Sequence, residues 1–288
     1  ENVDKVESLN PDLIPRLKAE IRAIRAYLYM KLVMLYGEVP LITQTIDQIS
    51  EGQEVTRTPK SEIWDFVNAE LDASAGTLPV FQEDIGRITK GAALAIKARA
   101  LLYQGNFSEA AAKANEVISL DVYSLYPRYQ LLFDYPAENS SEVILDKQFV
   151  KDDYSNNAFN LGPYSHRNSG SQYVPTKKLV DSYPMANGMK ISDPQSGFEI
   201  DHPYENRDPR LKYSIFVKGS PLYNGNIYDP TPGSGTNDEI QSTYLATSLG
   251  YNIKKYVNEE DFGDPTNSAI NIILIRYAEI LLTYAEAK

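Results

Sequence analysis

The sequence contains no cysteine, a single tryptophan and only two histidines among 288 residues. Without cysteine the chain can form no disulfide, and it offers no thiolate metal ligand and no cysteine nucleophile. The two histidines, His166 and His202, are far apart and lack the spacing of a zinc site, so neither a histidine-based metal centre nor a catalytic triad is expected. We predict no cofactor and no bound metal.

Positive charge is also scarce. The chain has 28 Lys plus Arg against 39 Asp plus Glu, which gives a net charge of -11, and no basic run reverses this sign locally. Because nucleic-acid backbones are polyanionic, nucleic acid is not an expected partner. The sequence also lacks an apolar run of the ~20 residues that a membrane-spanning helix needs, and no signal-type segment opens it.

The common catalytic signatures are absent as well. There is no Gly-rich phosphate loop, no Gly-x-Ser-x-Gly elbow and no His-Glu-x-x-His helix. The acidic residues 259–264 lack the ligand spacing of a calcium loop, and they indicate a solvated turn. The chain is therefore not expected to be an enzyme. A hydrolase stays open as an alternative, since acidic pairs act through spatial and not sequence separation.

Helical periodicity dominates the first part of the chain. Apolar residues recur at three- and four-residue spacing over residues 12–36, which predicts a long amphipathic helix that ends at Gly37. Start signals at residues 58–61 predict a second helix, in which Trp64 is expected to be a core residue. Two alanine-rich helices are predicted over residues 90–103 and 108–120.

The connection between these two alanine-rich helices is Gly105-Asn106-Phe107, a turn short enough for antiparallel packing. Together with the small residues Ala98, Ala110 and Ala114, it matches the second half of a tetratricopeptide repeat. In that pattern the small residues let the helices approach, and Phe107 is expected to fill the groove between them. The sequence therefore predicts a repeat-type helical hairpin.

After Asp121 the composition changes to Tyr, Pro, Gly, Asn and Ser. Short β-type runs are predicted at residues 143–145, 212–217 and 253–256. Loops this long are uncommon in a compact domain unless they build a binding surface. The last residues, 271–288, are predicted to be helical, and we expect the natural protein to continue beyond Lys288.

These patterns together predict a mainly α fold. Tetratricopeptide-like helical hairpins form the scaffold, with long irregular loops and a few short β-strands on one face. We expect a single domain over residues 1–288, in which residues 10–120 form the helical scaffold and 121–267 a loop-rich ligand-binding region. Residues 268–288 are expected to begin a C-terminal repeat helix.

The 21 tyrosines indicate where a binding site would lie. A carbohydrate site needs aromatic faces for the apolar side of pyranose rings, and planar polar groups for paired hydroxyls. The loop 154–173 supplies both, and a second loop adds two tyrosines; the candidate ligand-binding residues are Tyr154, Asn157, Tyr164, His166, Arg167, Asn168, Tyr173, Tyr223 and Tyr228. The alternative for each tyrosine is that its ring covers the core while its hydroxyl reaches water.

Several ordered segments carry a resemblance to a known family. Residues 22–29 and 35–42, with Tyr36-Gly37-Glu38-Val39-Pro40, form a long helix and its following turn. The hairpin 91–118, the segment 175–183, the Arg207-Asp208-Pro209-Arg210-Leu211 motif and residues 275–287 follow in order. In these segments the chain resembles the SusD/RagB family of tetratricopeptide-like outer-surface binding proteins, over nearly its whole length.

The resemblance implies a non-enzymatic nutrient-binding lipoprotein at the outer leaflet of a Bacteroidetes-type outer membrane, facing the extracellular space. Such a protein captures oligosaccharide and hands it to a SusC-like TonB-dependent transporter for glycan uptake. Alternatives are a RagB-like peptide-binding protein or a repeat-type protein–protein adaptor. The family's leader, lipidated cysteine and first repeat helices are expected to lie outside this sequence, so a lipid anchor outside it would provide membrane attachment. In the family, motifs hold the scaffold and ligand contacts lie on variable loops.

Overall fold

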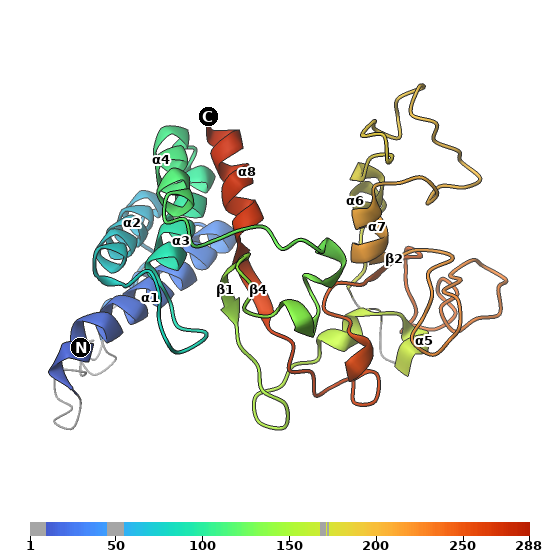
Figure 1. Ribbon diagram of the computed structural model, residues 1–288, viewed down its shortest axis with the longest axis horizontal. Helices are drawn as coiled ribbons and strands as arrows, with labels where there is room; N and C mark the ends of the chain where they lie inside the picture. Colours follow the sequence, from blue (N-terminus) through green and yellow to red (C-terminus); the bar gives the residue numbers. More distant parts are fainter. Residues whose placement is uncertain (1–9, 45–54, 168–170, 172) are drawn as a thin grey trace. The chain divides into compact units, whose positions relative to one another are not determined.

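The computed structural model describes residues 10–44, 55–167, 171 and 173–288 (Figure 1). The chain divides into two compact units. The helical unit comprises Glu1–Leu125, Ser141–Asp146 and Ile273–Lys288, and the loop-rich unit comprises Tyr126–Ser140 and Lys147–Ile272. Each unit has its own hydrophobic core.

The helical unit is a layered array of antiparallel helices. A 3-10 turn at Pro11–Leu13 leads into α1 (Ile14–Tyr36), which packs on α2 (Lys60–Thr77). Next come α3 (Lys90–Gln104), α4 (Phe107–Ile118) and α8 (Tyr277–Ala287), each packed on the preceding helix. Figure 1 shows α8, from the end of the chain, beside α3 and α4. The predicted mainly α fold is confirmed.

The α3–α4 hairpin forms for local reasons that the sequence contains. Thr89 caps α3 by accepting a hydrogen bond from the Ala92 N–H at 3.2 Å, and Gly105 ends it in the left-handed conformation at φ 77°. Ala98 and Ala114 are fully buried at the contact between helices. The expectation for Phe107 was wrong, because this residue begins α4 and leaves its side chain 51% exposed.

Helix α1 has the predicted length and ends at Gly37, but it carries two apolar faces. Its small face, with Ala23, Ala26 and Met30 fully buried, packs against the rest of the unit. The larger residues Ile21, Leu28 and Leu35, with others of the predicted stripe, stay exposed on this unit. Alanine allows α1 and α2 to approach closely, so the small face and not the bulky one forms the core contact.

A buried carboxylate joins α1 to α2. Glu70 is almost fully buried, and its Oε1 accepts two hydrogen bonds from Arg22, at 2.8 and 3.0 Å. Its Oε2 accepts from Arg25, which also lies over the ring of Phe66. Both oxygens are thus satisfied by arginines of α1, which is the condition for burying an acidic group without a large penalty. Trp64, as predicted, is a core residue of α2.

The segment before α8 differs from the prediction. Residues 272–276 form β4 (Ile272–Arg276), which pairs with β1 (Val143–Lys147), and helix begins only at Tyr277. The helical assignment of residues 272–276 was therefore wrong. The physical reason is the run of β-branched isoleucines, which fits a pleated strand. The Tyr277 N–H donates to the Glu142 carbonyl at 2.8 Å, which fastens the end of the strand.

Helix α3 holds this strand-to-helix junction by an arginine. Nε and Nη2 of Arg99 donate to the two carboxylate oxygens of Glu279 at 2.5 and 2.6 Å. Nη2 also donates to the Leu274 carbonyl at 2.7 Å. One guanidinium thus ties α3 both to the strand before α8 and to the first turn of α8.

The loop-rich unit contains little regular structure. Its helices are α5 (Tyr164–Arg167), α6 (Lys177–Ser182) and α7 (Pro209–Ser214), and β2 (Ile215–Phe216) pairs antiparallel with β3 (Asn252–Ile253). The strand predicted over residues 212–217 was wrong for its first half, because Asp208 caps α7 and Pro209 occupies its first turn. The predicted strand at 253–256 stops early, and Tyr256 has a positive φ of 66°.

A buried arginine organises the middle of this unit. The guanidinium of Arg207 donates to the carbonyls of Val180, Tyr183 and Pro203, each at 2.7 Å. Two of these carbonyls belong to the C-terminal end of α6, where helix carbonyls lack partners within the helix. Arg207 therefore caps α6 and at the same time holds the loop that contains Pro203.

Two helix glycines should respond in opposite ways to alanine. A Cβ on Gly91 would lie 2.8 Å from Cζ of Tyr123 and closer still to its hydroxyl, whereas a Cβ on Gly76 would meet nothing within 4 Å. We expect Gly91→Ala to lower the free energy of unfolding by about 1–3 kcal/mol through overpacking. Gly76→Ala should raise it by up to about 1 kcal/mol. Urea unfolding measures both, and equal effects of the two variants would contradict the packing of Tyr123 on α3.

Candidate functional site

The loop-rich unit is built on an aromatic cluster around His166, the third residue of α5. The His166 side chain is 2% exposed, and its ring stacks on Tyr223 with centroids 4.8 Å apart. It meets the ring of Phe216 edge-on at 5.3 Å and lies 5.6 Å from that of Phe159. His166 therefore belongs to the interior of this unit and supports the loop from within.

The surroundings of His166 favour its neutral form. Burial, together with the charge of nearby Lys254, lowers the pKa of His166 to about 4. Its Nε2 accepts a hydrogen bond from the Tyr223 N–H at 3.3 Å, so the ring proton is placed on Nδ1. Nδ1 has no hydrogen-bond partner within the described part of the chain. A charged imidazole would be poorly solvated here, which suits packing and not proton transfer.

Tyr228 is the second interior member of the predicted set. Its side chain is fully buried, and its hydroxyl donates to Oδ1 of Asn252 at 2.9 Å. Nδ2 of Asn252 donates in turn to the Gly162 carbonyl at 3.1 Å and to Oγ of Ser171 at 2.8 Å. Burial raises the pKa of Tyr228, so the hydroxyl keeps its proton. Asn252, on β3, thus links the predicted loop to the sheet, and no sequence motif indicates this role.

The remaining predicted residues divide by exposure. Tyr154, Asn157 and Tyr173 are exposed, and Tyr164 and Tyr223 are half-buried. The Tyr223 hydroxyl donates to the Val257 carbonyl at 2.6 Å, so it is occupied inside the unit. The side chain of Arg167 and the whole of Asn168 lie outside the described residues. The structure therefore leaves Tyr154, Asn157, Tyr164 and Tyr173 as candidates for ligand contact.

Tyr154 forms an exposed aromatic surface together with a residue that the sequence did not indicate. Its ring lies parallel to that of Phe149, with centroids 5.4 Å apart and an interplanar angle of 10°. Nζ of Lys147 lies 4.9 Å from the Phe149 centroid and 5.1 Å from that of Tyr154. We call these three residues the aromatic platform. Tyr154 itself is 54% exposed.

The platform is carried by a tight hairpin. The Tyr154 N–H donates to the Val150 carbonyl at 2.9 Å, and the Val150 N–H donates back to the Tyr154 carbonyl at 3.0 Å. At the turn, the Asp152 N–H donates to Oδ1 of Asn267 at 2.9 Å, and Nδ2 of Asn267 donates to Oδ1 of Asp152 at 2.6 Å. These bonds hold the turn in place, so the loop that carries the two rings need not become ordered when a ligand binds.

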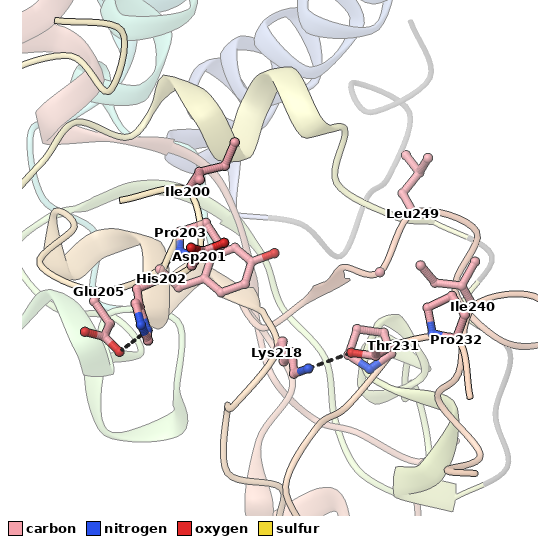
Figure 2. Close-up of a pocket in the computed structure, with 13 residues that line it drawn as sticks. Ile200, Asp201, His202, Pro203, Glu205, Lys218, Thr231, Pro232, Ile240 and Leu249 are labelled. Carbon is pink, nitrogen blue, oxygen red and sulfur yellow. Dashed lines mark hydrogen bonds and ion pairs between the residues drawn. The ribbon is translucent and has the colours of Figure 1, made fainter. Parts of the chain in front are cut away.

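A separate groove lies elsewhere in the same unit (Figure 2). Its volume is about 670 Å³, within the range of small-molecule sites. It is lined by residues 200–205, Lys218, residues 230–232, Ile240 and residues 249–250. We call it the Lys218 groove. None of the predicted ligand residues that the structure describes lines it.

The polar groups of the groove are arranged in pairs (Figure 2). Nζ of Lys218 donates to Oγ1 of Thr231 at 2.8 Å and lies 3.7 Å from Oδ1 of Asp229. Hydrogen bonds from Thr231, and secondarily the charge of Lys218, lower the pKa of Asp229, so this carboxylate stays ionised. On the other side, Nδ1 of His202 lies 3.1 Å from Oε1 of Glu205.

The described residues contain neither a cluster of metal ligands nor a helix that could cross a membrane. Among them, no three or more His, Cys, Asp or Glu side chains come together in a way that could hold a metal ion. No helix within the described ranges has the length and apolar character needed to cross a membrane.

Comparison with known proteins gives consistent relatives. The model of the SusD family matches residues 141–288. SusD-like protein P2 of Formosa agariphila is 26% identical over 270 residues, which are 91% of this chain and 50% of that protein. The chain spans about half the length of the curated relatives it matches.

Solved structures agree. A SusD-like carbohydrate-binding protein of Bacteroides fragilis has a TM-score of 0.83 and 26% identity, with 98% of this chain and 56% of that chain covered. A laminarin-binding SusD-like protein has a TM-score of 0.70 and 25% identity, with 98% of this chain and 62% of that chain covered.

The burial of His166 predicts a pH-dependent stability. In the unfolded chain histidine takes up its proton near pH 6.5, whereas folded His166 does so only near pH 4. Between these values the unfolded state binds more protons, so the free energy of unfolding falls as the pH is lowered. At about 1.4 kcal/mol per pKa unit, the loss attributable to His166 should reach about 3 kcal/mol and level off below pH 4.

Urea unfolding from pH 7 to pH 4 measures this loss. His166→Phe keeps an aromatic ring and removes the titrating group, so its stability should fall less on acidification than that of the wild type. His202→Gln is the matched control, because it removes the other histidine of the chain, whose side chain is 57% exposed. A His166→Phe variant with the wild-type pH dependence would show that His166 is not held neutral by burial.

Proposed function

Because the chain belongs to the SusD family, whose model matches residues 141–288, we propose that it binds carbohydrate without transforming it. The proposed ligand contacts are the aromatic platform together with Asn157, Tyr164 and Tyr173. The observation that carries this proposal is the pair of parallel rings, Phe149 and Tyr154, held at the surface by a braced hairpin.

The platform matches the chemistry of a sugar ring. A pyranose has an apolar face of C–H groups and a rim of hydroxyls, and an exposed aromatic ring binds the apolar face. The Lys147 ammonium, beside both rings, can donate to hydroxyl oxygens, and the exposed amide of Asn157 can donate and accept. Tyr164, which is half-buried, and Tyr173, which is exposed, are further candidate contacts from the same loop.

The relatives support the ligand class. One structural relative is described as carbohydrate binding and another as laminarin binding, at 26% and 25% identity to this chain. Because the chain spans only about half of the related proteins, the activity of the whole protein is part of the proposal.

We also propose the location and the partner that the family resemblance implies. The protein lies at the outer leaflet of the outer membrane and faces the extracellular space, attached by a lipid anchor outside these residues. It hands its oligosaccharide to a SusC-like TonB-dependent transporter. The chain's net charge of -11 is compatible with a cell-surface position and gives no support to an alternative partner such as nucleic acid.

Substitution of Tyr154 tests the platform. Tyr154→Ala should weaken carbohydrate binding about 3- to 10-fold, because aromatic stacking contributes about 0.5–1.5 kcal/mol. Tyr154→Phe keeps the ring and should keep the affinity. Tyr244→Ala is the control, since Tyr244 is 94% exposed and outside the platform. Calorimetric titration against a polysaccharide panel that includes laminarin gives the dissociation constants.

The same titrations separate the competing functions. Saturable carbohydrate binding that Tyr154→Ala weakens, with no released products, is the expected result. If only peptides bind, the ligand is peptide and not carbohydrate. If shorter sugars appear in the mixture, the protein cleaves its ligand and the non-enzymatic assignment is overturned. Full affinity in Tyr154→Ala would place the carbohydrate site away from the platform.

A further inference from the structure

The Lys218 groove has one wall that is braced from behind. This wall consists of residues 200–205. The Arg207 guanidinium donates to the Pro203 carbonyl at 2.7 Å, and the Glu205 N–H donates to the His202 carbonyl at 3.1 Å. The ring of Tyr204 meets that of Tyr251 edge-on at 6.4 Å. The wall is thus fastened to α6 and to the segment next to β3.

The opposite wall is braced within its own loop. The Glu239 carboxylate accepts from the N–H groups of Gly233 and Gly235 at 2.6 and 3.2 Å, and the Ile240 N–H donates to the Pro230 carbonyl at 3.0 Å. A Cβ at Gly250 would lie 3.3 Å from Cδ1 of Ile240 and 3.5 Å from Cγ of Pro230, so the backbone packs tightly there. A ligand would meet two preformed walls and little ordering cost.

The two walls differ in chemistry (Figure 2). Ile240, Pro232 and Leu249 lie on one side and present aliphatic groups without a hydrogen-bonding side chain. Asp201 and Glu205 lie on the other side and present carboxylates, next to the apolar side chains of Ile200 and Pro203. Between them lies Lys218. A ligand with an apolar face on one side and hydrogen-bonding groups on the other matches this arrangement.

The charges of the groove select among such ligands. The Lys218 ammonium is already compensated by Asp229, 3.7 Å away. Among the cationic side chains of the described residues, Glu205 pairs with His202 alone, and Asp201 has no ion pair with any of them. The three carboxylates of Asp201, Glu205 and Asp229 outnumber the two basic groups of Lys218 and His202, so the groove keeps excess negative charge even when His202 is protonated. The net charge of the whole chain is -11. A ligand with a positive group is attracted, and an anionic one is repelled.

We propose that the Lys218 groove is a second carbohydrate site, which takes a sugar carrying a protonated amine. The ammonium group lies beside Asp201 and Glu205, where its hydrogen bonds are charge-assisted. A hydroxyl or ring oxygen accepts from Lys218, and the C–H face of the sugar covers Pro232 and Leu249. The choice of a sugar as the ligand rests on the proposed function, whereas the preference for an amine rests on the groove alone.

Three trisaccharides with the same β-1,4-linked backbone test the preference. The trimers of glucosamine, N-acetylglucosamine and glucose differ only in the group at C2, and titration is done at a pH at which the amine is protonated. We expect the glucosamine trimer to bind about tenfold more tightly than the other two. Its advantage should shrink as salt is raised, because the contributing charges are exposed. Equal affinity of the three trimers would overturn the proposal.

Charge-removing variants locate the site. Asp201→Asn and Glu205→Gln should each weaken the glucosamine trimer several-fold and leave the glucose trimer unchanged. Glu199→Gln is the matched control, because Glu199 is exposed and close in sequence but does not line the groove. If all three variants behave alike, the preference comes from overall charge and not from the groove, and the proposal fails.

The Tyr154→Ala variant separates this inference from the proposed function. Its affinity for the glucosamine trimer should equal that of the wild type, because Tyr154 does not line the groove. Loss of that affinity in Tyr154→Ala, with Asp201→Asn unaffected, would assign the amine to the platform and overturn the second site. If other glycans bind at the platform and the glucosamine trimer binds nowhere, the groove assignment alone fails; if no carbohydrate binds at all, both fail.

Discussion

Backbone polar groups in a unit with little regular structure must find partners outside helices and sheets, and this constraint shapes the loop-rich unit. Polar side chains provide these hydrogen-bond partners. Arg207 serves three carbonyls, Asn252 joins a hydroxyl to a loop carbonyl, and the Glu239 carboxylate holds two glycine N–H groups. The platform hairpin is fastened in the same way by Asn267. Rigid surfaces are thus obtained from irregular backbone by buried or half-buried polar side chains.

The predictable part of the fold is the part in which neighbours in sequence are neighbours in space. Apolar periodicity and capping residues located α1, α2, α3 and α4 to within a few residues, because helices form from contacts three and four positions apart. The same periodicity misassigned residues 272–276, where the β-branched run pairs with β1 from far earlier in the chain. It also did not reveal that the small face of α1 is the buried one, since that depends on α2.

The candidate binding residues were only partly predictable from the sequence for the same reason. Residue type and loop position drew attention to Tyr154 as a candidate, but its stacking partner Phe149 becomes visible only with the hairpin. The residue type and loop position of His166 suggested a ligand contact, but the structure makes it a core residue. The rings of Phe159, Phe216 and Tyr223 converge on it from distant segments. The walls of the Lys218 groove come from loops that share no motif, so no local pattern could have joined them.

Each loop has two kinds of position: inward side chains that hold the backbone by hydrogen bonds, and outward side chains that face solvent. Arg207, Asn252 and Glu239 keep the backbone in place, whereas the side chains that face solvent, such as Tyr154, Asp201 and Leu249, contribute little to that framework. Outward positions can therefore be exchanged while the loop keeps its course. A combinatorial library that randomises only outward residues and retains the inward ones would diversify recognition on an unchanged scaffold, which makes this unit a practical starting point for engineered glycan reagents.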